Sequence, residues 1–257
     1  MYKKKEQCVD IIMPNYNKGK YIKESIKSVI KQSYKNWKLF IIDDSSNDNS
    51  RDIIKNFKKN KNIKIFFLKK NRGPSYCRNY GIKRSKSKFI AFLDSDDYWI
   101  KDKLKSQMNF MLRNNYPFTF TDYIPVLQNN NYKKKLKETK LENSFTFNKF
   151  IKNSSINTST IILEKKYLKN LKFRNVKLME DYIFKCELMK KTKLPFKKDP
   201  EVSAIYRIIK KSRSSKRISN IYNLWKKNKE FNKLNFSQNL LSVIFIAFNS
   251  FKKYGLK

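Results

Sequence analysis

Glycine is rare in this sequence, with four residues in 257, and neither a Gly-rich dinucleotide fingerprint nor a phosphate-binding P-loop is present. The three cysteines, Cys8, Cys77 and Cys186, are an odd number without metal-ligand spacing, which indicates reduced structural thiols in a cytoplasmic protein. The apolar segment at residues 9–13 is too short for a secretory signal. The longest apolar run, residues 240–248, falls well below the roughly 20 residues that span a bilayer. We therefore expect a protein that is neither secreted nor membrane-spanning.

Acidic residues are also scarce, because 21 Asp and Glu stand against 60 Lys and Arg and give a formal net charge of +39. Only nine of the basic residues are Arg, whereas sites for bidentate phosphate or base-edge recognition favour Arg. The Lys-rich runs are scattered along the chain and are not gathered into one basic arm. We therefore expect no nucleic-acid partner, and an anionic lipid surface is the favoured charged target.

The first hundred or so residues alternate short apolar runs with helical periodicity, which predicts βαβ units and a largely parallel sheet. Strands are expected at residues 9–13, 37–42, 63–68 and 89–93, with helices near residues 22–30, 50–57 and 76–82. Ser50 is expected to be the N-cap of the second of these helices. The alternation indicates an α/β fold in which a ligand crevice lies at the carboxyl ends of the strands.

The pattern becomes less regular after Trp99, and this half of the chain is expected to hold the variable substrate. Helices are expected at residues 104–112 and 181–191, and strands at residues 118–121, 159–163 and 202–206. A polar, basic stretch at residues 128–140 is interpreted as a mobile surface loop. A helical tail is expected from about residue 216 onward.

Three carboxylates directly follow the apolar run that ends at Leu93. Asp94, Asp96 and Asp97 concentrate negative charge within four residues, and their mutual repulsion calls for a compensating cation. Carboxylate oxygens suit Mg²⁺ or Mn²⁺, and a metal held by one or two of them keeps positions open for substrate phosphates. A solvated Asp-rich turn is the alternative interpretation of this segment.

Three motifs, read as sequence letters, occur in order: IIMPNYN at 11–17, IIDDSS at 41–46 and FLDSDD at 92–97. Together they resemble a family-2 glycosyltransferase of the GT-A fold, over roughly residues 8–210. The resemblance implies a mostly parallel nucleotide-binding sheet flanked by helices. It also implies a catalytic domain over residues 1–210, with a nucleotide-sugar half at about 8–98 and an acceptor half at about 99–210. Residues 211–257 are then a basic, amphipathic helical tail.

The resemblance also implies roles for the residues that would bind the nucleotide sugar. Pro14 and Tyr16 would lie against the nucleotide base, where an aromatic ring offers a stacking or edge contact. Asp44 would accept a hydrogen bond from a ring nitrogen of uracil, a role that requires an ionised acceptor. Arg72 would contact the base or a phosphate, and Asp94 would lie on the ribose side.

By the same resemblance, Asp96 would bind Mn²⁺ or Mg²⁺ at the donor diphosphate, with Asp97 supporting it. Asp181 would be the base that takes the proton of the acceptor hydroxyl, and Glu180 would orient the acceptor or the base. Without the resemblance, two acids in the first turn of a helix need only reflect the helix dipole. Arg78 has two interpretations, a contact with the nucleotide or stabilisation of the acid cluster.

The sequence departs from the family pattern in three ways. Met179 stands where many relatives have Gly before the acidic pair, and no His follows Tyr206 and Arg207. The basic residues that could replace this His electrostatically at the diphosphate are Lys210, Lys211 and Arg213. The Gln-x-x-Arg-Trp signature of processive synthases is absent, which favours an enzyme that adds a single sugar.

The resemblance implies an inverting, metal-dependent glycosyltransferase. It would move one sugar from a nucleoside-diphosphate donor, UDP-linked by the resemblance, to a hydroxyl of a lipid-linked saccharide in bacterial surface-polysaccharide synthesis. Two alternatives are a nucleotidyltransferase with a similar metal site and a basic nucleic-acid or lipid-surface binding protein with a degenerate nucleotide fold. The first should lack a base paired with a sugar acceptor, and the second should be indifferent to loss of Asp96.

The tail adds an expectation about location. Ile218, Ile221, Tyr222 and Trp225 share helical spacing, and the mostly apolar residues 240–251 precede two lysines. The tail either packs on the catalytic domain or lies in the interface of an anionic membrane. The second interpretation predicts a cytoplasmic enzyme associated peripherally with the inner face of the cell membrane.

Overall fold

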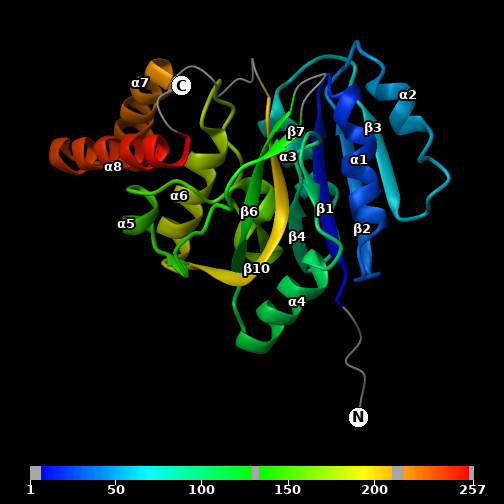
Figure 1. The fold of residues 1–257 in the computed structure, drawn as a ribbon, viewed down its shortest axis with the longest axis horizontal. Coiled ribbons are helices and arrows are strands. Elements are labelled where there is room, and N and C mark those ends of the chain that lie inside the picture. The colour runs from blue at the N-terminus through cyan, green and yellow to red at the C-terminus, as the bar shows by residue number, and fades with distance from the viewer. Residues whose placement is uncertain (1–6, 129–132, 210–216, 255–257) are drawn as a thin grey trace.

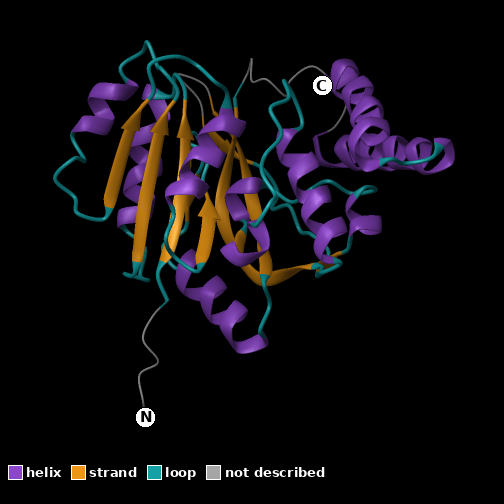
Figure 2. Ribbon diagram, turned by 180° about the vertical axis from the view of Figure 1, so that it is seen from behind, coloured by secondary structure: helices purple, strands orange, loops and turns teal. Residues whose placement is uncertain are grey.

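The computed structural model describes residues 7–128, 133–209 and 217–254. Their strands form one ten-stranded sheet in the order β3-β2-β1-β4-β9-β6-β10-β5, with β7 paired to β6 and β8 paired to β10. Figures 1 and 2 show helices on both faces of this sheet. The strands are β1 (Val9–Asn15), β2 (Trp37–Asp43), β3 (Ile63–Phe67), β4 (Phe89–Phe92), β5 (Tyr98–Trp99), β6 (Phe118–Gln128), β7 (Lys133–Lys135), β8 (Ser144–Phe145), β9 (Ile162–Glu164) and β10 (Phe196–Ile208).

The α-helices are α1 (Gly19–Ile30), α2 (Ser50–Lys55), α3 (Pro74–Arg84), α4 (Lys103–Asn114), α5 (Phe147–Phe150), α6 (Glu180–Thr192), α7 (Arg217–Lys227) and α8 (Phe236–Tyr254). The 3₁₀-helices η1 (Thr158–Thr160) and η2 (Lys165–Leu168) and the π-helix η3 (Asn228–Asn232) complete the order.

The N-terminal half is the parallel part of the sheet. β1 pairs in parallel with β2 on one side and β4 on the other, and β2 pairs in parallel with β3. Every residue of β1 is buried, as an apolar strand covered on both faces requires. The predicted βαβ arrangement of this half is confirmed. The carboxyl ends of these strands lie at one edge of the sheet, where the motif acids follow β2 and β4.

The close packing of α3 on β1 depends on Gly81. A Cβ atom at this position would lie 2.6 Å from the side chain of Ile12, so the helix approaches the strand as only glycine allows. This places the side chains of α3 near the carboxyl edge. The expected cap of α2 is wrong by one residue, because Asn49 is the N-cap. Ser50 instead accepts a hydrogen bond from the Lys18 N–H at 3.0 Å and ties the start of α1 to α2.

The second half is a mixed sheet, and several expected boundaries are wrong there. β9 runs antiparallel between β4 and β6, whereas β10 runs parallel to β6. β6 and β10 extend well beyond the expected four- and five-residue strands because each is paired with the other along most of its length. The expected loop at 128–140 contains β7, which pairs with β6. Of that segment, residues 129–132 lie outside the described residues.

The tail helices lie beside α6, at the end of the molecule opposite β3 (Figure 1). The helical tail is therefore confirmed over residues 217–254. Within the described residues, no helix combines the length and apolar character that crossing a membrane requires. The three cysteines are free, and burial raises the pKa of Cys186 to about 12, as expected of a structural thiol.

Candidate active site

The motif acid Asp44 joins two loops at the carboxyl edge of the sheet. Its carboxylate accepts hydrogen bonds from the backbone N–H groups of Arg72 at 2.8 Å and Gly73 at 2.7 Å. Gly73 has a φ of 84°, a left-handed conformation that glycine adopts without strain. Because Asp44 is buried and accepts both of these hydrogen bonds, it fixes the loop after β3 over the end of β2.

The other residues predicted to bind the nucleotide differ in accessibility. Pro14 is a buried residue of β1, whereas Tyr16, just beyond the strand, is 45% exposed. The guanidinium of Arg72 is also exposed and lies 4.7 Å from the centre of the Tyr76 ring. The groups available to a ligand in this part of the site are therefore the ring of Tyr16 and the guanidinium of Arg72. Their roles stay predictions.

The acids after β4 form a tight turn in which the Asp97 N–H donates to the Asp94 carbonyl at 2.9 Å. Two of the three carboxylates are partly exposed and each faces a cation. Asp94 lies 2.7 Å from Arg78, and Asp96 lies 2.6 Å from Lys18 at the start of α1. The side chains of Asp94 and Asp96 therefore present oxygens to the open edge of the sheet.

The third acid, Asp97, points into the protein. Its carboxylate accepts hydrogen bonds from the Ser159 hydroxyl at 2.6 Å and from the Arg207 N–H at 3.0 Å. Burial, followed by the charges of Asp96 and Asp94, raises the pKa of Asp97 well above its usual range. Asp97 thus ties the turn to η1 and β10, and a direct contact with a metal stays a prediction.

The second acidic pair begins α6. Met179, the N-cap, has a left-handed φ of 64°, a conformation that glycine adopts without strain. Asp181 lies 2.9 Å from the Lys185 ammonium and accepts a hydrogen bond from the Thr158 hydroxyl at 3.2 Å. Partial desolvation opposes ionisation of Asp181, but the Lys185 charge and hydrogen bond outweigh it and lower its pKa to about 2. Asp181 is therefore an ionised carboxylate, with a side chain that is 40% exposed.

Arg78 joins the two acidic groups. Its buried guanidinium lies 2.7 Å from Asp94 and 3.5 Å from Glu180, and its carbon lies 5.2 Å from the centre of the Phe173 ring. Burial would lower the pKa of Arg78, but Asp94 and Glu180 outweigh burial and raise it. Of its two interpretations, the structure supports stabilisation of the acids. The carboxylates after β4 and at the start of α6 are thereby brought into one site.

Comparison with known sequences decides the family. The family described as Glycosyl transferase family 2 matches residues 10–172, more than half of the chain. The chain belongs to glycosyltransferase family 2. It is an enzyme of the glycosyltransferase class, which favours glycosyl transfer over the nucleotidyltransferase and binding-protein alternatives.

Two curated relatives of this family-2 glycosyltransferase match most of its length. An uncharacterized glycosyltransferase of Haemophilus influenzae is 35% identical over 249 residues, covering 96% of this chain and 97% of that protein. The Escherichia coli UDP-Glc:alpha-D-GlcNAc-diphosphoundecaprenol beta-1,3-glucosyltransferase WfgD is 34% identical over 220 residues, covering 86% and 85%.

Two solved structures establish the GT-A fold of this family-2 glycosyltransferase. S. aureus TarS in complex with UDP-GlcNAc aligns with a TM-score of 0.71 at 21% identity, covering 96% of this chain and 73% of that chain. The mannosyltransferase PcManGT of Pyrobaculum calidifontis, solved with GDP-Man and Mn²⁺, aligns with a TM-score of 0.69 at 12% identity, covering 92% and 69%. The predicted fold class is therefore confirmed.

Several residues of this glycosyltransferase site escaped the sequence analysis. The contact of Lys185 with Asp181 could have been predicted, because Lys185 lies four residues after Asp181 on one helix face. Thr158 and Ser159 could not be predicted from the sequence, since their contacts depend on a short 3₁₀-helix that no sequence pattern indicates. Arg207 follows Tyr206 in the late segment, for which the sequence suggests a diphosphate contact, whereas its backbone N–H donates to Asp97. The alternative diphosphate contacts, Lys210, Lys211 and Arg213, lie outside the described residues.

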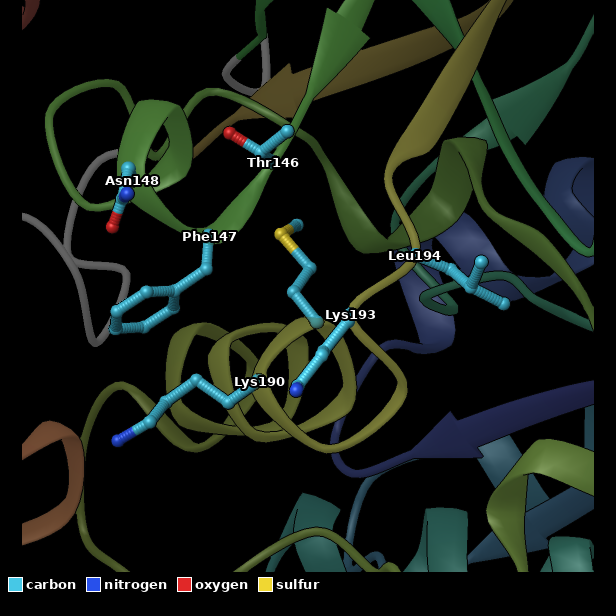
Figure 3. A pocket seen from close by; sticks show the side chains of 7 residues that line it. Thr146, Phe147, Asn148, Lys190, Lys193 and Leu194 are labelled. Atoms are coloured by element: carbon cyan, nitrogen blue, oxygen red, sulfur yellow. The ribbon is translucent and has the colours of Figure 1, made fainter.

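Two pockets of this glycosyltransferase lie apart from the acids. One, of about 310 Å³, lies at the far end of α6, with Thr146, Phe147 and Asn148 on one side and Lys190 and Lys193 on the other (Figure 3). No residue predicted for the site lines it. The other, of about 500 Å³, follows α1 and β5 and is lined mainly by lysines. The candidate active site is therefore identified by its charged groups and not by either of these two pockets.

Proposed function

We propose that the chain is an inverting, metal-dependent glycosyltransferase that adds one sugar from a UDP-linked donor to a hydroxyl of a lipid-linked saccharide. One observation carries the proposal: Arg78 links a donor-side acid, Asp94, to the acidic pair at the start of α6. The name of WfgD describes a UDP-glucose donor and a diphosphoundecaprenol-linked acceptor. Relatives of this kind support a place in cell-surface polysaccharide synthesis, at the inner face of the cell membrane.

The donor side of the site suits a divalent ion. The part-exposed carboxylate oxygens of Asp94 and Asp96 are hard ligands. Each carboxylate contacts a side-chain cation, and a metal ion could provide the positive charge in place of that cation. Among the described residues, no group of three or more acidic, His or Cys side chains is arranged to enclose a metal. Asp96, with Asp94 beside it, would hold Mn²⁺ or Mg²⁺ and leave other positions to the diphosphate. When bound, the ion stabilises negative charge on the departing diphosphate.

On the acceptor side, the residues suit removal of a proton. Asp181 is ionised and partly exposed, so it can accept the proton of an acceptor hydroxyl as that oxygen attacks the sugar. Thr158 and Lys185 hold one of its oxygens, which leaves the other for the acceptor. Glu180 is held by Arg78 and is suited to orienting the acceptor. A single attack from the side opposite the diphosphate inverts the configuration at the sugar carbon.

The test measures donor binding and transfer together. A panel of nucleotide sugars with Mn²⁺ is scored by thermal shift, because a bound ligand raises the melting temperature by mass action. Transfer to a polyprenyl-diphosphate-linked sugar is then measured with the donor that binds. Asp96→Asn should abolish transfer and the metal-dependent shift, whereas Asp52→Asn, at an exposed acid of α2, should change neither. Undiminished turnover in Asp96→Asn would remove this residue from the proposed role.

A further inference from the structure

The last helix, α8, buries two polar residues and leaves most of its large apolar side chains exposed. Asn239 and Ser242 are buried, at 2% and 0% exposure. The opposite side carries six large apolar side chains that are 42–62% exposed. This set, here called the apolar tail face, consists of Leu240, Leu241, Ile244, Phe245, Phe248 and Phe251. Val243 and Ile246 are partly buried and pack on the core, but the six larger exposed side chains stay outside, whereas a helix packed on a domain for stability buries most of its apolar side.

The polar side of α8 is already occupied by the catalytic body. Ser242 donates to the Ile151 carbonyl and accepts a hydrogen bond from the Asn228 amide at 2.8 Å. The Asn228 side chain in turn accepts one from the Tyr182 hydroxyl at 2.7 Å. Tyr182 follows the predicted base Asp181 on α6. The tail is therefore fixed to the helix that carries the acceptor-side acids, and its apolar face stays exposed.

The exposed apolar surface of the molecule is concentrated on the tail. Nine of its thirteen exposed large apolar side chains in the described residues lie at position 221 or beyond. A contiguous apolar face of this kind on a soluble domain marks an interaction surface. Figures 1 and 2 show α8 projecting from one end of the molecule, clear of the sheet.

Positive charge accompanies this face. The Lys152 ammonium lies 5.9 Å from the centre of the Phe245 ring, at the border of the face. Lys226, near the end of α7, is exposed, as are Lys229 and Lys233 between α7 and α8. Glu230 is the one acidic residue in the sequence from 217 to 254, against seven Lys or Arg. The tail thus combines an apolar stripe with a strongly basic composition, as helices that lie in the headgroup region of anionic bilayers do.

We propose that the apolar tail face is a docking surface for an anionic lipid bilayer. The proposal rests on the proposed function in that a lipid-linked acceptor is presented at such a surface. A second copy of the chain is a poorer occupant, because a two-fold contact through this face would bring two basic tails together. The hydrogen bonds from Ser242 through Asn228 to Tyr182 would then hold α6, and with it Asp181, at a fixed orientation to the membrane.

The experiment is sedimentation of the full chain with vesicles of phosphatidylcholine alone and of phosphatidylcholine with phosphatidylglycerol. Binding should rise with phosphatidylglycerol and fall with added salt. The double variant Ile244→Ser with Phe248→Ser should bind about tenfold more weakly or worse, since it removes two exposed apolar side chains. The matched control is Leu112→Ser, at an exposed leucine of α4, which should bind as the wild type does.

A second variant keeps the test decisive if the double variant is less stable. Lys152→Ser alters one exposed charge at the border of the face and should weaken binding only to the anionic vesicles. Equal sedimentation of wild type and both variants would overturn the proposal. So would a wild-type dimer in light scattering that the double variant converts to a monomer, because a second copy would then cover the face.

The test separates this proposal from the proposed function. Asp96→Asn should lose transfer and still bind vesicles as the wild type does. Failure of every donor to be transferred, with vesicle binding intact, would count against the proposed function alone. Loss of selective vesicle binding, with transfer to a detergent-solubilised acceptor intact, would count against the docking surface alone.

Discussion

Two buried lysines, Lys185 on α6 and Lys103 on α4, differ in the contacts that their side-chain nitrogens make. Lys185 is 2% exposed and Lys103 is 1% exposed. The Lys185 ammonium donates to the Ile156 carbonyl at 2.7 Å and to Asp181 at 2.9 Å, with Thr158 at 3.5 Å. The Lys103 ammonium has no hydrogen-bond partner among the described residues and lies 4.2 Å from the Trp99 ring.

The contacts of the two lysines have different effects on the pKa values of the groups involved. Burial lowers the pKa of Lys103 well below its usual range, and only the charge of Asp199 opposes that effect. Lys185, by contrast, is paired, and it keeps the pKa of Asp181 low. The buried cation on α6 therefore lowers the pKa of the neighbouring Asp181, whereas the one on α4 should cost stability.

The largest effect on turnover should come from removing the carboxylate of Asp181, the partner of Lys185. Asp181→Asn keeps the shape of the side chain but cannot take a proton, so turnover should fall by roughly 10²- to 10⁴-fold with donor binding nearly intact. Glu180→Gln should cost less, because Glu180 is held by Arg78 and orients rather than accepts. Single-turnover rates at saturating donor and acceptor measure both. A more severe loss in Glu180→Gln would move the base assignment to Glu180.

Removing the paired lysine should change the pH dependence. Lys185 helps to lower the pKa of Asp181 from 3.8 to about 2, so Asp181 stays ionised well into acid. In Lys185→Met that pKa rises, and the acid limb of kcat/KM should move to higher pH. At neutral pH, where Asp181 is still ionised, the loss should be on the order of tenfold or less. Lys191→Met, at an exposed lysine of the same helix, is the matched control. An unmoved acid limb would show that Lys185 does not govern the base.

The same pair contributes to stability in a defined pH window. Because the folded-state pKa of Asp181 is depressed, its contribution is present above about pH 4 and is lost as pH falls toward about 2. Lys185→Met should therefore flatten the acid end of the stability profile. Urea denaturation between these pH values, beside Lys191→Met, would show whether it does.

The sequence predicts those parts of the molecule whose structure is decided locally. β1, β2, β3 and β4 are each apolar runs bounded by polar residues, so their place in a parallel sheet follows from the pattern alone. The length of β6 and β10 does not, because these strands extend through pairing with each other. The same division holds at the site.

At the site, the sequence predicts the acids that end strands, because their position along one strand reveals them. It does not predict the side-chain contacts between these acids and their partners, because those contacts join segments that are distant in the sequence. Arg78 and Glu180 are 102 residues apart in the chain, and Ser159 and Asp97 are 62 apart. Asp181 and Lys185 are the exception, since a four-residue spacing on a helix predicts contact.

The smallest effect should come from the unpaired lysine, and it should have the opposite sign. Lys103→Met keeps the length of the side chain and removes a buried amine that lacks a hydrogen bond among the described residues, so the free energy of unfolding should rise by about 1–3 kcal/mol at neutral pH. In the wild type the unfolded chain binds more protons than the folded one between the lowered pKa and 10.5, so stability rises with pH across that interval. The variant should lose this slope, whereas Lys105→Met, exposed on the same helix, should keep it. Chemical denaturation at several pH values gives both quantities, and a loss of stability in Lys103→Met would mean that its contact with the Trp99 ring outweighs the cost of burial.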